Sequence, residues 1–214
     1  MEVLDNWDAL GMRASGSNDV VLKNCVVPEG SVQVSGTWGD ILNEGSLPLL
    51  IANNIGLVGV SLGIAEAARD LIVQEVKTRR KAPNNRILAE RYPFQHGIAE
   101  LEINLAACRA MLARTFLAAD AYLGSHPPGV ATLDELHQLY KDGQCTKHFV
   151  THAAIAIVDC AMALSGGAGY LSKHPLSRLY RDVRAGPFMQ AYSPNEAFEY
   201  IGKVTLGLDP RIDV

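Results

Sequence analysis

Cysteine is sparse in this sequence and is never closely paired. The chain has 214 residues and only four cysteines, Cys25, Cys108, Cys145 and Cys160, with no CxxC arrangement among them. This spacing excludes a zinc knuckle and a disulfide framework of the kind that staples small secreted proteins. We therefore expect reduced thiols and a cytoplasmic protein.

A surplus of basic charge and long apolar runs are also lacking. The formal net charge is −4 and the 19 Lys and Arg residues are spread along the chain, which excludes the basic face of a nucleic-acid-binding protein. Asn53, Asn54 and charged residues interrupt the apolar runs before these reach the roughly 20 residues that cross a bilayer. No basic-then-apolar leader opens the chain. We expect neither nucleic acid nor a membrane among the partners.

The sequence is otherwise that of a globular protein, with 48% hydrophobic and 20% charged residues. Its first 36 residues differ from the rest. Residues 19–34 alternate and are rich in valine, with turn residues between the runs, which predicts short strands. Because two or three strands cannot form a core alone, residues 1–40 are interpreted as the end of a β-domain whose beginning is absent. Residues 41–214 form a second, helical domain.

Helical periodicity begins at Ser46, with Pro48 just inside the first predicted helix. A capping box, Thr132 to Glu135, opens the third helix, and a similar start at Ser193 opens the last. The helices are predicted over residues 46–80, 98–124, 132–164 and 175–184 and after residue 193. Long antiparallel helices with wide apolar stripes and polar links predict a mainly α fold, an up-down four-helix bundle.

The third predicted helix ends abruptly in Ser165-Gly166-Gly167. Glycine costs a helix about 1 kcal/mol per residue, so the pair needs a reason. One glycine is explained by a left-handed helix cap. Two in a row indicate that another group approaches the main chain closely. Both interpretations stay open on this evidence.

Two motifs carry a family resemblance. The stretch WDALGMRASGS at residues 7–17, followed by DVVLKNCVVPEG, resembles the end of the middle β-domain of acyl-CoA dehydrogenase flavoenzymes. The stretch SGGAGYLSKHPLSRLYRDVRAG at residues 165–186 resembles the C-terminal helices of the same family. The motifs stand in the family's order and together span nearly the whole chain. The resemblance implies a helical bundle after a β remnant, an FAD cofactor and self-association as a dimer or tetramer.

The resemblance also implies cofactor-binding residues. Ser165, Gly166 and Gly167 match the turn that approaches the flavin dinucleotide of a neighbouring subunit, where glycine leaves main-chain amides accessible to phosphate. Arg80 is similar to the arginine that reaches the pyrophosphate, because a permanently charged guanidinium suits phosphate. Arg79 is the alternative, and either arginine could simply complement the helix dipole. Gln95 matches a glutamine near the cofactor, with an exposed helix-start residue as its alternative.

The catalytic base is harder to match. Acyl-CoA dehydrogenases use a glutamate before the last helix to remove the α-proton while hydride leaves for the flavin. Glu196 is the carboxylate nearest that position, although it also fits as the capping partner of Ser193. A second family position for the base falls near Asn53, which cannot take a proton. Asn53 and Asn54 interrupt an apolar helix, and we expect them either to face the substrate cavity, which we favour, or to bond a partner helix.

Three functions follow. The first is a flavin-dependent oxidoreductase that introduces an α,β double bond into an acyl-CoA thioester. The second is a two-component flavin-dependent monooxygenase with an aromatic substrate, which the long link at residues 77–102 favours. The third is a fragment or assembly module without catalysis.

A metal site is not expected. His148 and His152 stand one helical turn apart, but no third ligand has convincing spacing.

Overall fold

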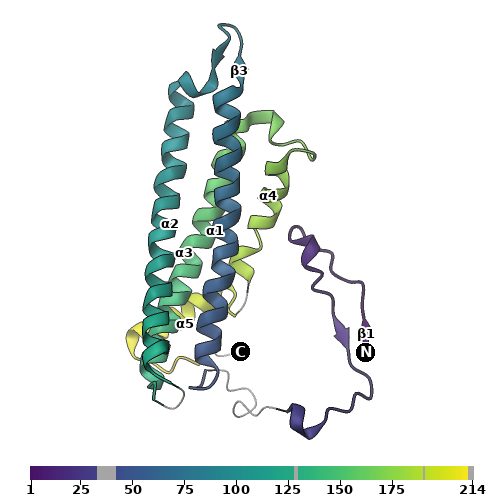
Figure 1. Ribbon diagram of the computed structural model, residues 1–214, viewed down its shortest axis with the longest axis vertical. Coiled ribbons are helices and arrows are strands. Elements are labelled where there is room, and N and C mark those ends of the chain that lie inside the picture. The colour runs from purple at the N-terminus through teal and green to yellow at the C-terminus, as the bar shows by residue number, and fades with distance from the viewer. Residues whose placement is uncertain (33–41, 128–129, 190, 212–214) are drawn as a thin grey trace.

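Three long helices lie side by side and form the body of the molecule. The computed structural model describes residues 1–32, 42–127, 130–189 and 191–211 (Figure 1). Helix α1 spans Leu47–Thr78, α2 spans Tyr92–Ser125 and α3 spans Leu133–Ser165, which gives each a length of about 50 Å at 1.5 Å per residue. Short connections at alternate ends make neighbouring helices antiparallel. The predicted mainly α bundle is confirmed.

The helices begin where their local sequence directs. Ser46 precedes α1 with Pro48 in its first turn, and the Thr132 hydroxyl accepts the amide hydrogen of Glu135 at the start of α3. The predicted end of α1 at Arg80 is wrong, because the helix stops at Thr78. From there the chain enters a small hairpin in which β3, Arg80–Lys81, pairs antiparallel with β4, Arg86–Ile87. The 3-10 helix η3, Leu88–Glu90, then leads into α2.

The fourth position of the bundle is shared by two shorter helices. Helix α4, Pro175–Val183, packs against one half of α1 and α3, and α5, Pro194–Leu206, packs at the opposite end of α3 (Figure 1). Two 3-10 helices flank α4: η4, Gly166–Ala168, and η5, Gly186–Phe188. Each half has its own apolar core. One is built around Ile72, Leu105 and Leu176, the other around Ile51, Tyr140 and Tyr200.

By length and composition alone, α1 and the stretch 133–168 are apolar enough to cross a membrane. The prediction that asparagines and charges keep every apolar run too short for a span therefore fails on that criterion. In the structure the apolar stripes of the two helices pack against each other along the bundle axis. Such packing is typical of the central helices of a bundle.

The N-terminal segment lies beside the bundle and has little regular structure. Strand β1, Glu2–Val3, pairs antiparallel with β2, Val20–Val21, and the 3-10 helices η1, Arg13–Ser15, and η2, Glu29–Ser31, complete it (Figure 1). The prediction of several strands over residues 19–34 is wrong for the described part, since β2 is the only strand in residues 19–32. The physical reason is the shortage of pairing partners, because isolated two-stranded ladders are marginal. Residues 33–34 and the predicted domain boundary near residue 40 lie outside the described residues.

The N-terminal segment contacts the bundle at α4. The Met12 amide donates a hydrogen bond of 2.7 Å to Asp182 Oδ1 on α4. At Gly11, a Cβ atom would lie only 2.2 Å from the Arg181 carbonyl oxygen, so only glycine fits there without displacing the backbone. The motif at residues 7–17 is therefore docked on α4, at Arg181 and Asp182.

Candidate functional site

At the hairpin end of the bundle, Arg79 and Ser165 are brought together by Glu75. The Arg79 Nη1 atom lies 2.7 Å from Glu75 Oε1 and donates a second hydrogen bond of 2.8 Å to the Ser165 carbonyl. The Ser165 hydroxyl donates to the same carboxylate, at 2.8 Å to Oε2. The end of α1 is thereby fixed to the end of α3. The Arg79 side chain still has 43% of its surface exposed.

The glycines that follow Ser165 are open to solvent. Gly166, the C-cap of α3, has a φ of 68° and a ψ of −151°, a positive-φ conformation that favours glycine but is not the left-handed helical one. A Cβ atom at Gly166 or Gly167 would meet nothing within 4 Å. The space above the main chain is therefore open. Gly166 does cap α3, as predicted, although not in the left-handed helical conformation. The close approach of another group to the glycine pair stays a prediction.

Arg80 and Gln95, the other two predicted cofactor residues, form hydrogen bonds away from the Ser165 turn. Arg80 lies in strand β3 and donates to the Asn85 carbonyl at 2.9 Å, across the hairpin turn. Gln95, exposed in the first turn of α2, donates to the Ala89 carbonyl at 3.0 Å. Of the two candidate arginines, the structure thus brings Arg79 to the Ser165 turn. The roles assigned to Arg80 and Gln95 stay predictions.

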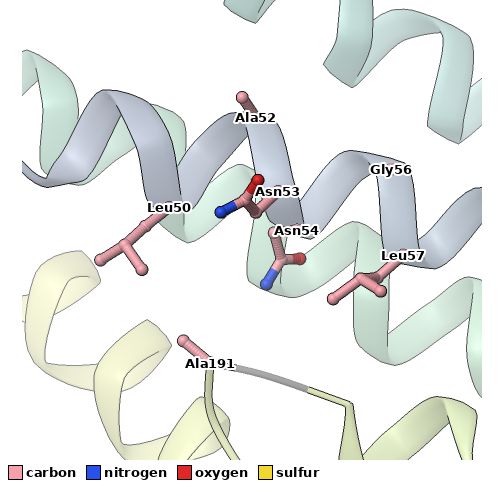
Figure 2. Close-up of a pocket in the computed structure, with 7 residues that line it drawn as sticks. All are labelled: Leu50, Ala52, Asn53, Asn54, Gly56, Leu57 and Ala191. Atoms are coloured by element: carbon pink, nitrogen blue, oxygen red, sulfur yellow. The ribbon is translucent and has the colours of Figure 1, made fainter. Parts of the chain in front are cut away.

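A pocket of about 370 Å³ lies toward the other end of α1. Figure 2 shows Leu50, Asn54 and Leu57 pointing from α1 toward the side on which Ala191 lies. Asn54 is buried, whereas Asn53 is exposed at the pocket's edge. Both asparagines line this pocket, while the expectation that it is a substrate cavity stays a prediction. The described residues that line it are Leu50, Ala52, Asn53, Asn54, Gly56, Leu57 and Ala191.

A buried lysine that the sequence analysis missed is hydrogen-bonded to the connection that carries Ala191. Lys147, on α3, is only 4% exposed. Its Nζ donates hydrogen bonds to the carbonyl oxygens of Met189 and, at 2.6 Å, of Tyr192, on either side of Ala191. Burial lowers the pKa of Lys147 to about 8, although the nearby Glu196 carboxylate opposes this shift. No local motif marks this lysine, because its partners stand more than 40 positions away.

Similarity to known proteins agrees with this architecture. The profile described as "Acyl-CoA dehydrogenase, C-terminal domain" matches residues 55–194, which is more than half of the chain. The chain belongs to the acyl-CoA dehydrogenase family. This is the family of flavin-dependent oxidoreductases that its sequence motifs indicate.

Particular members of the acyl-CoA dehydrogenase family are more similar than others. The chain is 37% identical over 212 residues to L-evernosamine nitrososynthase of Micromonospora sp., and 34% identical over 207 residues to amino sugar nitrososynthase DnmZ of Streptomyces peucetius. A crystal structure of KijD3 in complex with FMN and dTDP-3-amino-2,3,6-trideoxy-4-keto-3-methyl-D-glucose superposes with a TM-score of 0.86 and 35% identity. These matches cover 97–98% of this chain but 47–49% of the relatives, so the chain spans about half their length.

The hairpin end of the bundle carries Gly166 and Gly167, and we call it the glycine end. It fits the flavin that the acyl-CoA dehydrogenase family uses. Flavin nucleotides carry phosphate, which is bound by guanidinium groups and by accessible main chain. Arg79 is partly exposed, and Gly166 and Gly167 leave open space above the main chain. These residues provide a cationic donor and a close backbone approach within one small region. The rings of His148 and His152 lie close together, with centroids 4.2 Å apart and planes tilted by 35°. The described residues contain no group of three potential metal ligands.

Glu196, the predicted base, has a structural role at the start of α5. It forms the capping box with Ser193, whose amide donates to the carboxylate at 2.7 Å. These hydrogen bonds from Ser193 hold the pKa of Glu196 below its ordinary value, and Lys147 adds to the effect. A base that removes a carbon-bound proton needs the opposite shift. The capping alternative is therefore confirmed, while a catalytic role for Glu196 stays a prediction.

Proposed function

We propose that this chain is the helical part of a flavin-dependent oxidoreductase that oxidises the amino group of a nucleotide-linked amino sugar. Two relatives support this reaction, L-evernosamine nitrososynthase of Micromonospora sp. and an amino sugar nitrososynthase of Streptomyces peucetius. The observation that carries the proposal is the chemistry of the pocket on α1. Its described lining consists of apolar side chains and two carboxamides, with no charged group.

Carboxamides suit a sugar better than they suit proton abstraction. Each offers two N–H donors and one carbonyl acceptor, which match hydroxyl and keto groups of either polarity. Asn53 and Asn54 would thus orient the sugar ring, while Leu50 and Leu57 contact its methyl-bearing, deoxygenated face. A carboxamide cannot accept the α-proton of a thioester at neutral pH. The pocket therefore favours chemistry in which the chain orients the substrate and removes no carbon-bound proton.

The conversion of an amine to a nitroso group removes two hydrogens and adds one oxygen, a four-electron oxidation. A bound flavin, once reduced, supplies activation of molecular oxygen for such a reaction. This chain's own contribution is binding and orientation of the amine, with the apolar wall limiting the access of water. FMN accompanies KijD3, whereas the sequence motifs indicate FAD, so we propose a flavin nucleotide of either kind.

We further propose that Arg79, Ser165, Gly166 and Gly167 contact the flavin of a second copy of the chain, with Gln95 and Arg80 nearby. Arg79 stands about 39 Å from Asn53 along α1, at about 1.5 Å per residue. One flavin cannot reach the sugar pocket and this end of the bundle together. The proposal thus requires self-association, as a dimer or tetramer. A cytoplasmic location also remains a prediction.

Dehydrogenation of an acyl-CoA thioester is the second candidate, with Glu196 as its base. Membership in the acyl-CoA dehydrogenase family favours it. The lowered pKa of Glu196 weighs against it, because the carboxylate is stabilised by its capping hydrogen bonds. The aromatic substrate and the assembly module, also predicted from the sequence, are outcomes that the following experiment distinguishes.

The test supplies the complete gene product with flavin, a flavin reductase, oxygen and the dTDP-amino sugar named above. We expect a product that has lost two hydrogens and gained one oxygen, with the label from ¹⁸O₂ found in it by mass spectrometry. Parallel reactions contain butyryl-CoA without oxygen, or an aromatic phenol with oxygen. Bleaching of the flavin by butyryl-CoA, with the sugar unchanged, would show that the dehydrogenase candidate is right. A protein that takes up no flavin would support the assembly module.

A further inference from the structure

The connection between η5 and α5 is held in place from both sides. On one side Gly186 packs so closely that a Cβ atom would lie 2.6 Å from Ser61 Oγ of α1 and 3.1 Å from Thr151 of α3. On the other side Tyr192 is buried, with its ring 5.8 Å from that of Tyr140 and 5.3 Å from that of Tyr200, centroid to centroid. After η5 ends at Phe188, the described residues Met189 and Ala191 are in neither a helix nor a sheet.

Buried carbonyl groups in such a connection need donors from elsewhere. A carbonyl oxygen that is buried without a hydrogen bond is costly, and regular secondary structure does not provide one here. Lys147 supplies two, to the carbonyl oxygens of Met189 and Tyr192. The two acceptors flank Ala191, and Ala191 is the one described residue of the pocket lining that does not come from α1.

We propose that Lys147 is a positioning residue for the pocket: by bonding the carbonyls on both sides of Ala191, it fixes the wall that faces Asn54. The inference rests on the proposed function in taking the pocket as the substrate site. Lys147 itself is not among the described residues that line the pocket, so we assign it the holding of the wall and not contact with a substrate. A lysine suits the task because its flexible stem crosses from α3 while the ammonium group offers three N–H donors.

The first experiment measures the wall directly, without any substrate. Lys147→Met keeps the length and apolar volume of the side chain and removes its donors. Amide hydrogen exchange in the peptide covering residues 186–193 is expected to become roughly tenfold faster in this variant, because opening no longer breaks the two bonds. Lys141→Met is the matched control. Lys141 lies on the same helix, but its Nζ bonds Gln138 on that helix, so its variant should exchange like the wild type.

The second experiment measures the pocket. The dTDP-amino sugar named above should bind Lys147→Met roughly tenfold more weakly than it binds the wild type, with flavin affinity unchanged, because the glycine end of the bundle is untouched. Lys147→Gln, which retains two N–H donors on a shorter stem, should recover part of both effects. It also serves as the test variant if the methionine variant fails to fold.

The outcomes separate this inference from the proposed function. Unchanged exchange in residues 186–193 overturns the positioning role, whatever the substrate is. Faster exchange with unchanged sugar affinity overturns the link between Lys147 and the pocket. Faster exchange in a protein whose wild type binds no dTDP-amino sugar supports the positioning of the wall and overturns the proposed substrate.

Discussion

The buried Lys147 predicts an unusual response of the bundle to alkaline pH. Its pKa is about 8 in the folded protein, against an ordinary value of 10.5 for lysine. Between about pH 8 and pH 10.5 the unfolded chain holds more protons than the folded one, so the free energy of unfolding rises with pH. The burial penalty is fully present below pH 8 and absent above 10.5. Removing the charge need not break the connection, since a neutral amine keeps two N–H donors for the two carbonyls.

The magnitude follows from the shift. A difference of 10.5 minus about 8 corresponds to a penalty of about 3 kcal/mol at neutral pH, of which about 2 kcal/mol is regained between pH 7 and 9.5. Other groups titrate in this range and above. Burial raises the pKa of Cys108 and Cys145, and it raises the pKa of Tyr192 to about 12. These groups are common to wild type and Lys147→Met, so the difference between the two proteins isolates the lysine.

The assay is urea unfolding followed by circular dichroism at pH 7, 8, 9 and 9.5 for both proteins. We expect the wild type to gain about 2 kcal/mol relative to Lys147→Met across this series. Glu196 is the charged group that faces Lys147 from α5, and Glu196→Gln should steepen the gain by removing the opposing attraction. A stability difference that stays constant with pH would refute the reasoning, because it would mean that Lys147 is hydrated and titrates like a surface lysine.

Three further predictions concern the ends and faces of the bundle. Gly167→Leu should leave the melting temperature unchanged, since a Cβ atom there meets open space, but should weaken flavin binding at least roughly tenfold in a fluorescence titration; equal affinity would remove this turn from the cofactor site. Arg79→Gln should weaken flavin binding and Arg80→Gln should not, because only Arg79 bonds the Ser165 carbonyl; the reverse order would restore Arg80 as the phosphate ligand. Phe116→Glu should dissociate the assembly in light scattering, since Phe116 is 51% exposed beside an apolar groove between α1 and α2; an unchanged mass would place the interface elsewhere.

Helix starts could be predicted because their signals are local. The Thr132 to Glu135 and Ser193 to Glu196 boxes each satisfy backbone groups within one turn, so a few adjacent residues decide the outcome. The N-terminal strands could not be predicted in the same way. Valine-rich alternation states which residues could pair, but a strand also needs a partner, and β2 finds only two residues of β1.

The sequence predicted which region forms the candidate flavin site, but not which of the two arginines lies beside Ser165. The end of α1 falls two residues before Arg80, and that small difference sends Arg80 into a hairpin while Arg79 turns toward Ser165. Helix ends depend on the competition between helix and hairpin hydrogen bonds, which local sequence determines only to within a residue or two. The role of Lys147 could not be predicted from the sequence, for another reason. In the sequence it is an ordinary lysine of an amphipathic helix, and only the tertiary fold brings the two carbonyls to it.

The division of the fourth helix position has a further consequence. A single helix running the full length of the bundle would cover the Asn54 side of α1 and close it to solvent. Here the chain leaves the helical path after α4 and resumes it at α5, and the residue that borders the pocket comes from this interruption. The pocket is open to solvent at this interruption. The size of the opening depends on the length of the connection as well as on the side chains that line it. Insertions or deletions between Val183 and Pro194 should therefore change which molecules can enter, while the three long helices remain as they are.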